Sequence, residues 1–157
     1  MLARGKSDTR RRHDVDLDDV ARDEIAAFRN RFPDATIARQ LEPVRIQGDS
    51  DALRRVVANL LDNAHRHGGG RVAIELTHHA DQYRLTIDDD GEGVPSQYRQ
   101  RIFERFARLD TSRSRRAGGS GLGLAIVGEI VQEHHGTVTV DDSDLGGARF
   151  TIVLPTG

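Results

Sequence analysis

The clearest pattern of apolar and polar positions lies between residues 51 and 67. At about 100° of rotation per residue, the apolar positions of this stretch share one broad arc of a helix. They are Leu53, Val56, Val57, Leu60, Leu61 and Ala64. Gly48-Asp49-Ser50 supplies an N-cap before the stretch, and three glycines at positions 68–70 follow it. The pattern predicts an amphipathic helix whose apolar face belongs to the core.

Shorter patterns predict the remaining elements. Irregular helical spacing indicates a helix from Leu17 to Phe32, and the apolar run AIVGEIVQEHH at 125–135 indicates another. Runs rich in alternating apolar residues predict strands, and two pairs of them predict hairpins. The strands are expected at 36–41 and 44–47, joined at Glu42-Pro43, with hairpins formed by 71–79 and 83–90 and by 137–143 and 148–155.

Length and composition describe an ordinary globular domain. The chain has 157 residues, a formal net charge of -2 and no cysteine. The charge gives no nucleic-acid footprint, and the lack of cysteine excludes disulfides and thiolate metal sites. No apolar run reaches the roughly 20 residues of a membrane span. We expect a disordered lead-in at 1–14, a connecting helix and first strands at 15–48, and a core at 49–157, with 15–157 forming one domain.

Polar side chains follow one flank of the helix predicted at 51–67. Asn59, Asn63 and Arg66 are spaced i, i+4 and i+7, so they project in nearly the same direction. Asparagine prefers caps and turns to helix interiors. Two asparagines beside an apolar stripe therefore favour a polar site at the edge of the core, where His67 can also lie. Solvated asparagines on a surface helix are the plain alternative.

A carboxylate and two glycines follow the strand predicted at 83–90, in the sequence Asp89-Asp90-Gly91-Glu92-Gly93-Val94. Glycines allow a tight turn over which a flat ligand can lie close to the backbone. An ionised carboxylate only accepts hydrogen bonds, which suits the amino group of adenine and opposes the carbonyl of guanine. Taken alone, the motif is also consistent with a turn that carries solvated acids.

A second glycine-rich stretch, 118–124, precedes the apolar run at 125–135. Glycine-freed amides at a helix N-terminus form an anion site, for which phosphate is a natural ligand. A flexible linker before a buried helix is the alternative. The only lysine is Lys6, so this is no Walker loop, and the dinucleotide GxGxxG spacing is not met.

The segment between the two glycine-rich stretches reads as a mobile lid. Ile102, Phe103 and Phe106 can anchor one end of it, and the phenylalanines can pack when it closes. Arg113, Arg115 and Arg116 can reach phosphate oxygens. Arginines that are merely solvated are the alternative for any one of these three.

Four motifs in order carry a resemblance to a known family. NLLDNAHRH, DDDGEGVP, IFERFARLD and GGSGLGLAIVGEIV resemble the N, G1, F and G2 boxes of the ATP-binding catalytic domain of bacterial sensor histidine kinases. These domains belong to the superfamily of gyrase, heat-shock chaperone and mismatch-repair ATPases. The resemblance spans about residues 49–155 and implies an α/β two-layer sandwich of the Bergerat type, with a mixed, largely antiparallel sheet covered on one face by helices.

The resemblance also implies roles for single residues. Asn63 would bind Mg²⁺, Asn59 and Arg66 would contact the phosphates of ATP, and Asp89 would bind the adenine amino group. Further nucleotide contacts are implied for His67, Gly91, Gly93, Val94, Phe103, Phe106, Arg115, Gly119, Ser120, Gly121, Leu122, Gly123 and Leu124. His67 departs from the Tyr or Phe often found at its position, which leaves its role open.

Hydrolytic members of the superfamily carry a water-activating Glu where this chain has Asn59, and an amide cannot act as a base. The resemblance therefore implies transfer of the γ-phosphoryl group to a histidine on a separate dimerisation domain, and from there to a response regulator. His13 lacks the surrounding acceptor motif. We expect a cytoplasmic fragment of a parent kinase anchored in the inner membrane, nearly inert alone, with no nucleic-acid or membrane contact of its own. A superfamily ATPase, a serine kinase acting on a regulatory protein and a binding module without transfer are the rival functions.

Overall fold

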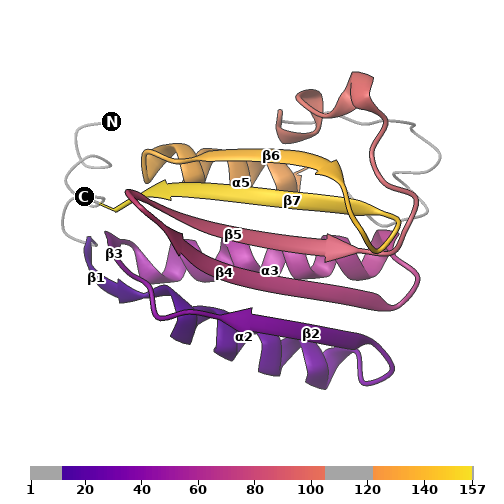
Figure 1. Ribbon diagram of the computed structural model, residues 1–157, viewed down its shortest axis with the longest axis horizontal. Helices are drawn as coiled ribbons and strands as arrows, with labels where there is room; N and C mark the ends of the chain where they lie inside the picture. The colour runs from indigo at the N-terminus through magenta and orange to yellow at the C-terminus, as the bar shows by residue number, and fades with distance from the viewer. Residues whose placement is uncertain (1–11, 105–121, 157) are drawn as a thin grey trace.

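The computed structural model describes residues 12–104 and 122–156 (Figure 1). Its helices are α2 (Leu17–Arg31), α3 (Ser50–His67) and α5 (Leu122–Glu133), with the short 3-10 helices η1 (Ser96–Tyr98) and η2 (Arg101–Phe103). Its strands are β1 (His13–Asp16), β2 (Thr36–Leu41), β3 (Arg45–Gly48), β4 (Arg71–His79), β5 (Gln82–Asp89), β6 (Thr137–Asp142) and β7 (Ala148–Pro155).

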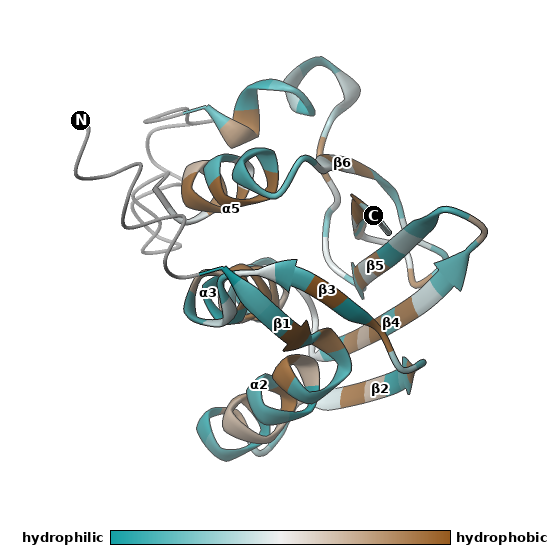
Figure 2. Cartoon of the chain, turned by 90° about the vertical axis from the view of Figure 1, so that its left-hand side faces the viewer, coloured by the Kyte–Doolittle hydropathy of each residue, from teal (hydrophilic) through white to brown (hydrophobic). Residues whose placement is uncertain are grey.

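Five strands form one sheet in the order β2-β4-β5-β7-β6. β2 and β4 run parallel, and the other neighbouring pairs of this sheet are antiparallel. Helices α2, α3 and α5 lie together on one face of the sheet (Figure 2). The predicted two-layer sandwich with a mixed, largely antiparallel sheet is therefore confirmed.

The core lies between the helices and the inner face of the sheet. All six apolar positions predicted for the core-facing arc of α3 are buried. Because strand residues alternate between faces, Leu85, Ile87 and Asp89 point to the helix side, while Asp88 points to the outer side. On the outer side Asp88 forms a bidentate ion pair with Arg149 of β7, in which the Nε–Oδ1 and Nη2–Oδ2 distances are both 2.9 Å. Of the two aspartates that end β5, Asp89 therefore points toward the helix layer and Asp88 points away from it.

The start of α3 is fixed by the predicted cap. The Asp49 side chain accepts hydrogen bonds from the backbone N–H groups of Asp51 at 3.0 Å and Ala52 at 3.2 Å. These bonds satisfy donors that a helix start leaves unpaired. None of the helices in the described ranges is long and apolar enough to cross a membrane.

One expectation about the first 48 residues is wrong. Residues 13 and 14, assigned to a disordered lead-in, belong to β1, which pairs with β3 and buries Val15 opposite Ile46. The strands predicted at 36–41 and 44–47 are both present, the second shifted by one residue, and they belong to different sheets. β2 pairs with β4 in parallel, whereas β3 pairs with β1 in an antiparallel arrangement.

Candidate functional site

Asp89 lies at the end of β5 with only 2% of the residue exposed. Its Oδ1 accepts hydrogen bonds from the backbone N–H groups of Gly91 at 2.9 Å and Ala148 at 3.1 Å. Burial disfavours the charged form and raises the pKa of Asp89 above its ordinary value of 3.8, although both N–H groups oppose the shift. Both hydrogen bonds that the described residues donate to this side chain reach Oδ1, which leaves Oδ2 to accept from a ligand.

The turn after Asp89 lies directly against the end of α3. A Cβ added to Gly91 would lie 1.9 Å from the carbonyl oxygen of His67, so a side chain does not fit there. Gly93 has a φ of +78°, in the left-handed region that favours glycine. The first glycine of the motif is thus required by contact with the helix, and the second by backbone conformation.

Asp90 connects the same turn to the glycines that follow α3. Its Oδ1 accepts hydrogen bonds from the backbone N–H groups of Gly69 at 2.6 Å and Arg71 at 3.2 Å. Desolvation acts to raise the pKa of Asp90, but the backbone hydrogen bonds outweigh it and hold the pKa below its ordinary value. The pKa values of the two adjacent carboxyl groups therefore shift in opposite directions.

Gly147, in the turn between β6 and β7, is a functional position that sequence reasoning missed. A Cβ on Gly147 would lie 2.1 Å from Oδ1 of Asp89 and 2.4 Å from the backbone nitrogen of Gly91. Its own N–H donates to the Asp89 carbonyl at 3.1 Å. The available sequence signal was the adjacent pair Gly146-Gly147. In the structure only Gly146 of this pair has a positive φ, of +109°. The second glycine is there for close approach to Asp89.

The flank of α3 carries the predicted polar side chains. Asn59 and Asn63 are half-buried, whereas Arg66 and His67 are exposed. All four belong to one continuous helix, so the predicted spacing of i, i+4 and i+7 holds for the first three. The Nδ2 group of Asn59 donates a hydrogen bond to the Gly123 carbonyl at 3.2 Å, which places this flank beside the start of α5.

Helix α5 begins at Leu122, and its first turn contains Gly123 and Leu124. Gly123 is exposed and Leu124 is half-buried. Among the described residues, Cγ of Asn59 lies 4.0 Å from a Cβ built on Gly123. The first turn of α5 therefore lies beside the α3 flank, and the dipole of a helix N-terminus favours anions.

Phe103 lies in η2 between the sheet and α5. Its ring meets that of Phe150 edge to face, with centroids 6.0 Å apart, and Ile102 beside it is buried. The backbone of Phe103 also approaches Gly128, where an added Cβ would be 3.5 Å from the Phe103 oxygen. Seven residues predicted for the site or its lid lie outside the described residues: Phe106, Arg113, Arg115, Arg116, Gly119, Ser120 and Gly121.

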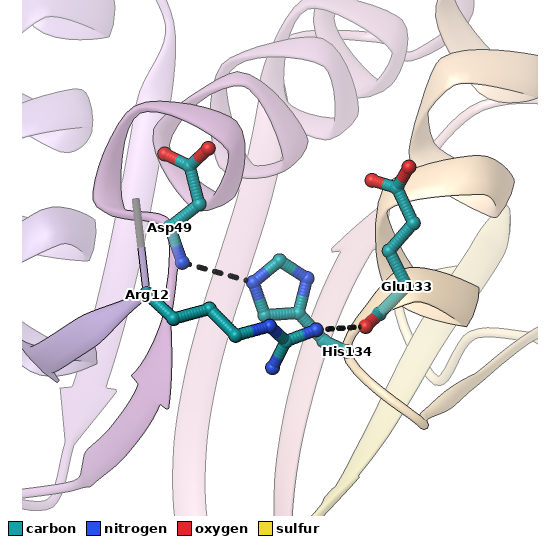
Figure 3. Close-up of a pocket in the computed structure, with 4 residues that line it drawn as sticks. All are labelled: Arg12, Asp49, Glu133 and His134. Carbon is teal, nitrogen blue, oxygen red and sulfur yellow. Dashed lines mark hydrogen bonds between the residues drawn. The ribbon is translucent and has the colours of Figure 1, made fainter. Parts of the chain in front are cut away.

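A hollow at the opposite end of α3 and α5 is lined by Arg12, Asp49, Glu133 and His134 (Figure 3). The Asp49 N–H donates to Nε2 of His134 at 3.1 Å, and Nδ1 of His134 contacts the Ile130 carbonyl at 2.7 Å. The volume of this hollow is about 140 Å³, below the roughly 300–1,000 Å³ of small-molecule pockets. This hollow is separate from the Asp89 region, since it lies beyond the N-cap of α3.

Comparison with known proteins identifies the family. Residues 48–157 match the family described as histidine kinase-, DNA gyrase B- and HSP90-like ATPases. The chain belongs to this family. All the motif residues of the Asp89 turn, the α3 flank and the α5 start lie within the matched part of this ATPase domain.

Its relatives narrow the type of ATPase domain. The chain is 43% identical over 145 residues to a probable sensor histidine kinase, TcrY of Mycobacterium tuberculosis. The matched region covers 90% of this chain and 30% of that relative. The mycobacterial sensor histidine kinase MprB superposes with a TM-score of 0.82 at 37% identity, over 92% of this chain and 97% of that one. The ATP binding domain of PrrB from Mycobacterium tuberculosis gives 0.79 at 32% identity, over 94% and 98%. The chain is a histidine kinase-type ATPase catalytic domain that spans under a third of the curated relative.

Proposed function

We propose that this domain binds Mg-ATP and donates the γ-phosphoryl group to a histidine on a separate dimerisation domain of its parent kinase. In this proposal Oδ2 of Asp89 accepts a hydrogen bond from the adenine amino group, above the turn at Gly91 and Gly93. Guanine would present a carbonyl to the same oxygen, acceptor against acceptor. An unmatched buried polar contact of this kind costs about 1–3 kcal/mol, which is enough for strong base selection.

The α3 flank supplies the proposed phosphate and metal contacts. The amide oxygen of Asn63 fits Mg²⁺, which prefers oxygen ligands and keeps several waters beside the substrate phosphates. Bound there, Mg²⁺ would neutralise part of the phosphate charge. Arg66 is exposed and can reach the phosphates, and Asn59 keeps one N–H of its amide for them after donating the other to Gly123.

Several contacts complete the proposal. Phe103, with Phe106 and Arg115, would cover the nucleotide, and the stretch around Gly119 and Gly121 would hold its phosphates. His67, Val94, Ser120, Leu122, Gly123 and Leu124 are proposed as further nucleotide contacts. The phosphorylated histidine would then serve a response regulator.

The observation that carries transfer over hydrolysis is the identity of Asn59. It lies one helical turn before Asn63 on the same flank, beside the start of α5. An amide cannot take a proton from water, so Asn59 cannot serve as the general base for hydrolysis at this position. Catalysis then rests on positioning and on neutralising charge around the transferred group.

The test mixes the chain with Mg²⁺, γ-labelled ATP and a separately made histidine-bearing hairpin of the same parent. The expected result is a labelled hairpin whose phosphate is lost in acid. Labelling that depends on the chain, on Mg²⁺ and on the acceptor histidine supports the proposal.

Three other outcomes would overturn it. Steady phosphate release by the chain alone indicates an ATPase, and an acid-stable label on a partner serine indicates a serine kinase. Binding of ATP with neither release nor transfer in the presence of the hairpin indicates a regulatory binding module.

A further inference from the structure

Arg99 links the turn after Asp89 to the far edge of the sheet. Its Nε donates a hydrogen bond to the Val94 carbonyl at 2.9 Å, and its Nη2 contacts Oδ1 of Asp142 at 2.8 Å. A longer ion pair joins Nη1 to Asp141 at 3.5 Å. The Arg99 side chain is 25% exposed, whereas the two aspartates are mostly exposed, at 86% and 68%. The bond to Val94 is therefore the better shielded of these contacts.

The two groups that Arg99 joins both belong to the surroundings of Asp89. Val94 ends the glycine turn on which the proposed adenine site rests. Asp142 is the register partner of Ala148, whose N–H donates to Oδ1 of Asp89. One guanidinium thus connects the end of the turn to the strand pair that holds the Asp89 carboxylate.

The backbone on each side of this turn is already fixed by other contacts. Asp90 holds it to Gly69 and Arg71 at the α3 side, and Gly147 packs against it at the hairpin side. Between Gly93 and η1, the side-chain hydrogen bond that the described residues show on the turn's backbone comes from Arg99. Gly93 has a left-handed φ, a conformation that glycine adopts more readily than other residues.

We propose that Arg99 is a positioning residue for the adenine-facing turn: it fixes the Val94 end, and so sets the height of the backbone beneath the base. This inference rests on the proposed function. Arginine suits the task because its planar fork donates in two fixed directions at once. Lysine is a single flexible ammonium and can satisfy Val94 or Asp142 with less directional control.

The test compares the parent chain with Arg99→Gln and Arg99→Lys, using calorimetric titration with Mg-ATP and with inorganic tripolyphosphate. Arg99→Gln is expected to weaken ATP binding about three- to tenfold, since one charge-assisted hydrogen bond to the turn is lost. The ATP affinity of Arg99→Lys should fall between those of the parent and of Arg99→Gln. Asp142→Asn should change ATP affinity by about twofold or less, because its ion pair is exposed. Tripolyphosphate affinity should stay at the parent value in every variant, because it lacks the base.

Arg84→Gln provides the matched control, since Arg84 is an exposed arginine of the neighbouring β5 with its side chain on the outer face of the sheet. It should leave both affinities unchanged. A thermal melt of each variant reports the fold separately.

The outcomes separate this inference from the proposed function. If the parent binds ATP and Arg99→Gln binds it equally well, the positioning role is wrong and the proposed function stands. If ATP and tripolyphosphate weaken together in a folded variant, Arg99 acts on the whole site and the inference is also wrong. A parent that does not bind ATP overturns both.

Discussion

The two ends of the candidate site are built by different means. The proposed base end, formed by Asp89, Gly91, Gly93 and Gly147, is closed by backbone hydrogen bonds and by contacts too tight for a Cβ. The proposed phosphate end, formed by Asn59, Asn63, Arg66 and Gly123, consists of side chains on one helix flank and the start of a second helix. The contacts that shape the base end are already formed within the chain. The groups of the phosphate end would instead be brought together around a charged ligand.

This difference follows from what each end has to recognise. A base is planar and is selected by one edge, so a fixed acceptor at a fixed height gives selectivity at little entropic cost. Phosphates are strongly charged and tolerate several arrangements of donors around them. We therefore expect substitutions at the base end to change nucleotide affinity most, and substitutions at the phosphate end to change transfer.

The largest effect is expected for Gly147→Ala. Its Cβ would lie 2.1 Å from Oδ1 of Asp89, so the hairpin or the carboxylate must move. We expect a loss of about 1–3 kcal/mol in unfolding free energy together with loss of measurable ATP binding. Gly128→Ala is the matched control in α5, where the Cβ would meet Phe103 at an ordinary contact distance of 3.5 Å and the alanine favours the helix by up to about 1 kcal/mol. A melt and a nucleotide titration on both variants measure the contrast, and equal losses in the two would contradict it.

Asp89→Asn should have the next largest effect, and should spare the fold. An asparagine can keep its Oδ1 toward the N–H groups of Gly91 and Ala148, but it replaces the free acceptor with an amide donor. We expect ATP affinity to fall about 10- to 100-fold, from the loss of one matched buried hydrogen bond. Asp90→Asn is the control, because both of its backbone partners bind the same Oδ1. Unchanged ATP affinity in Asp89→Asn would remove Asp89 from the base end.

A smaller and graded effect is expected from acid. The pKa of Asp89 is raised by burial, so the carboxylate takes up a proton above the pH at which an ordinary aspartate does. The protonated form cannot offer the same acceptor, and ATP affinity should fall by up to about tenfold per pH unit below that pKa. The free energy of unfolding changes in the opposite direction. The folded state binds this proton more tightly than the unfolded state, so protonation of Asp89 at falling pH stabilises the fold.

Titration from pH 7 downward, with a melt at each pH, distinguishes these two signs. Asp90, whose pKa is lowered, contributes stability that is lost only further down, as pH falls through its folded pKa. His67 acts on Asp89 through its charge, and its protonation favours the carboxylate. A His67→Gln variant removes this charge, so its change of ATP affinity with pH, and not its absolute affinity, is compared with that of the parent. No change with pH in either chain would count against the titration of Asp89.

The sequence predicted the parts of the molecule that local periodicity controls. Helix α3, its Asp49 cap and the β4–β5 hairpin lie where the pattern indicated, and the alternation along β5 places Asp89 on the helix side. β1 and the parallel partner of β2 were not predicted, because pairing between distant segments leaves little trace in a short strand.

The same limit applies to the site. Asp89 and Gly91 could be predicted because they are neighbours in a motif, and Asn59 and Asn63 because helical spacing aligns them. Gly147 and Arg99 act on that motif from elsewhere in the chain, and only their folded contacts reveal it. The only sequence trace of Gly147 was its place in the pair Gly146-Gly147.

The smallest change in affinity is expected for Asn63→Ala, and it tests the phosphate end directly. The side chain is half-buried on the α3 flank, so its removal leaves the base end and the apolar arc of the helix in place. Affinity for ATP without Mg²⁺ should stay within about twofold of the parent, since no contact to the base is lost. Phosphoryl transfer to the added hairpin should fall by at least about tenfold, because the proposed metal ligand is gone. Asn30→Ala, at an exposed asparagine of α2, is the control for both assays. Transfer at the parent rate by Asn63→Ala would show that the metal is held elsewhere, and a large loss of metal-free affinity would show that the two ends do not act separately.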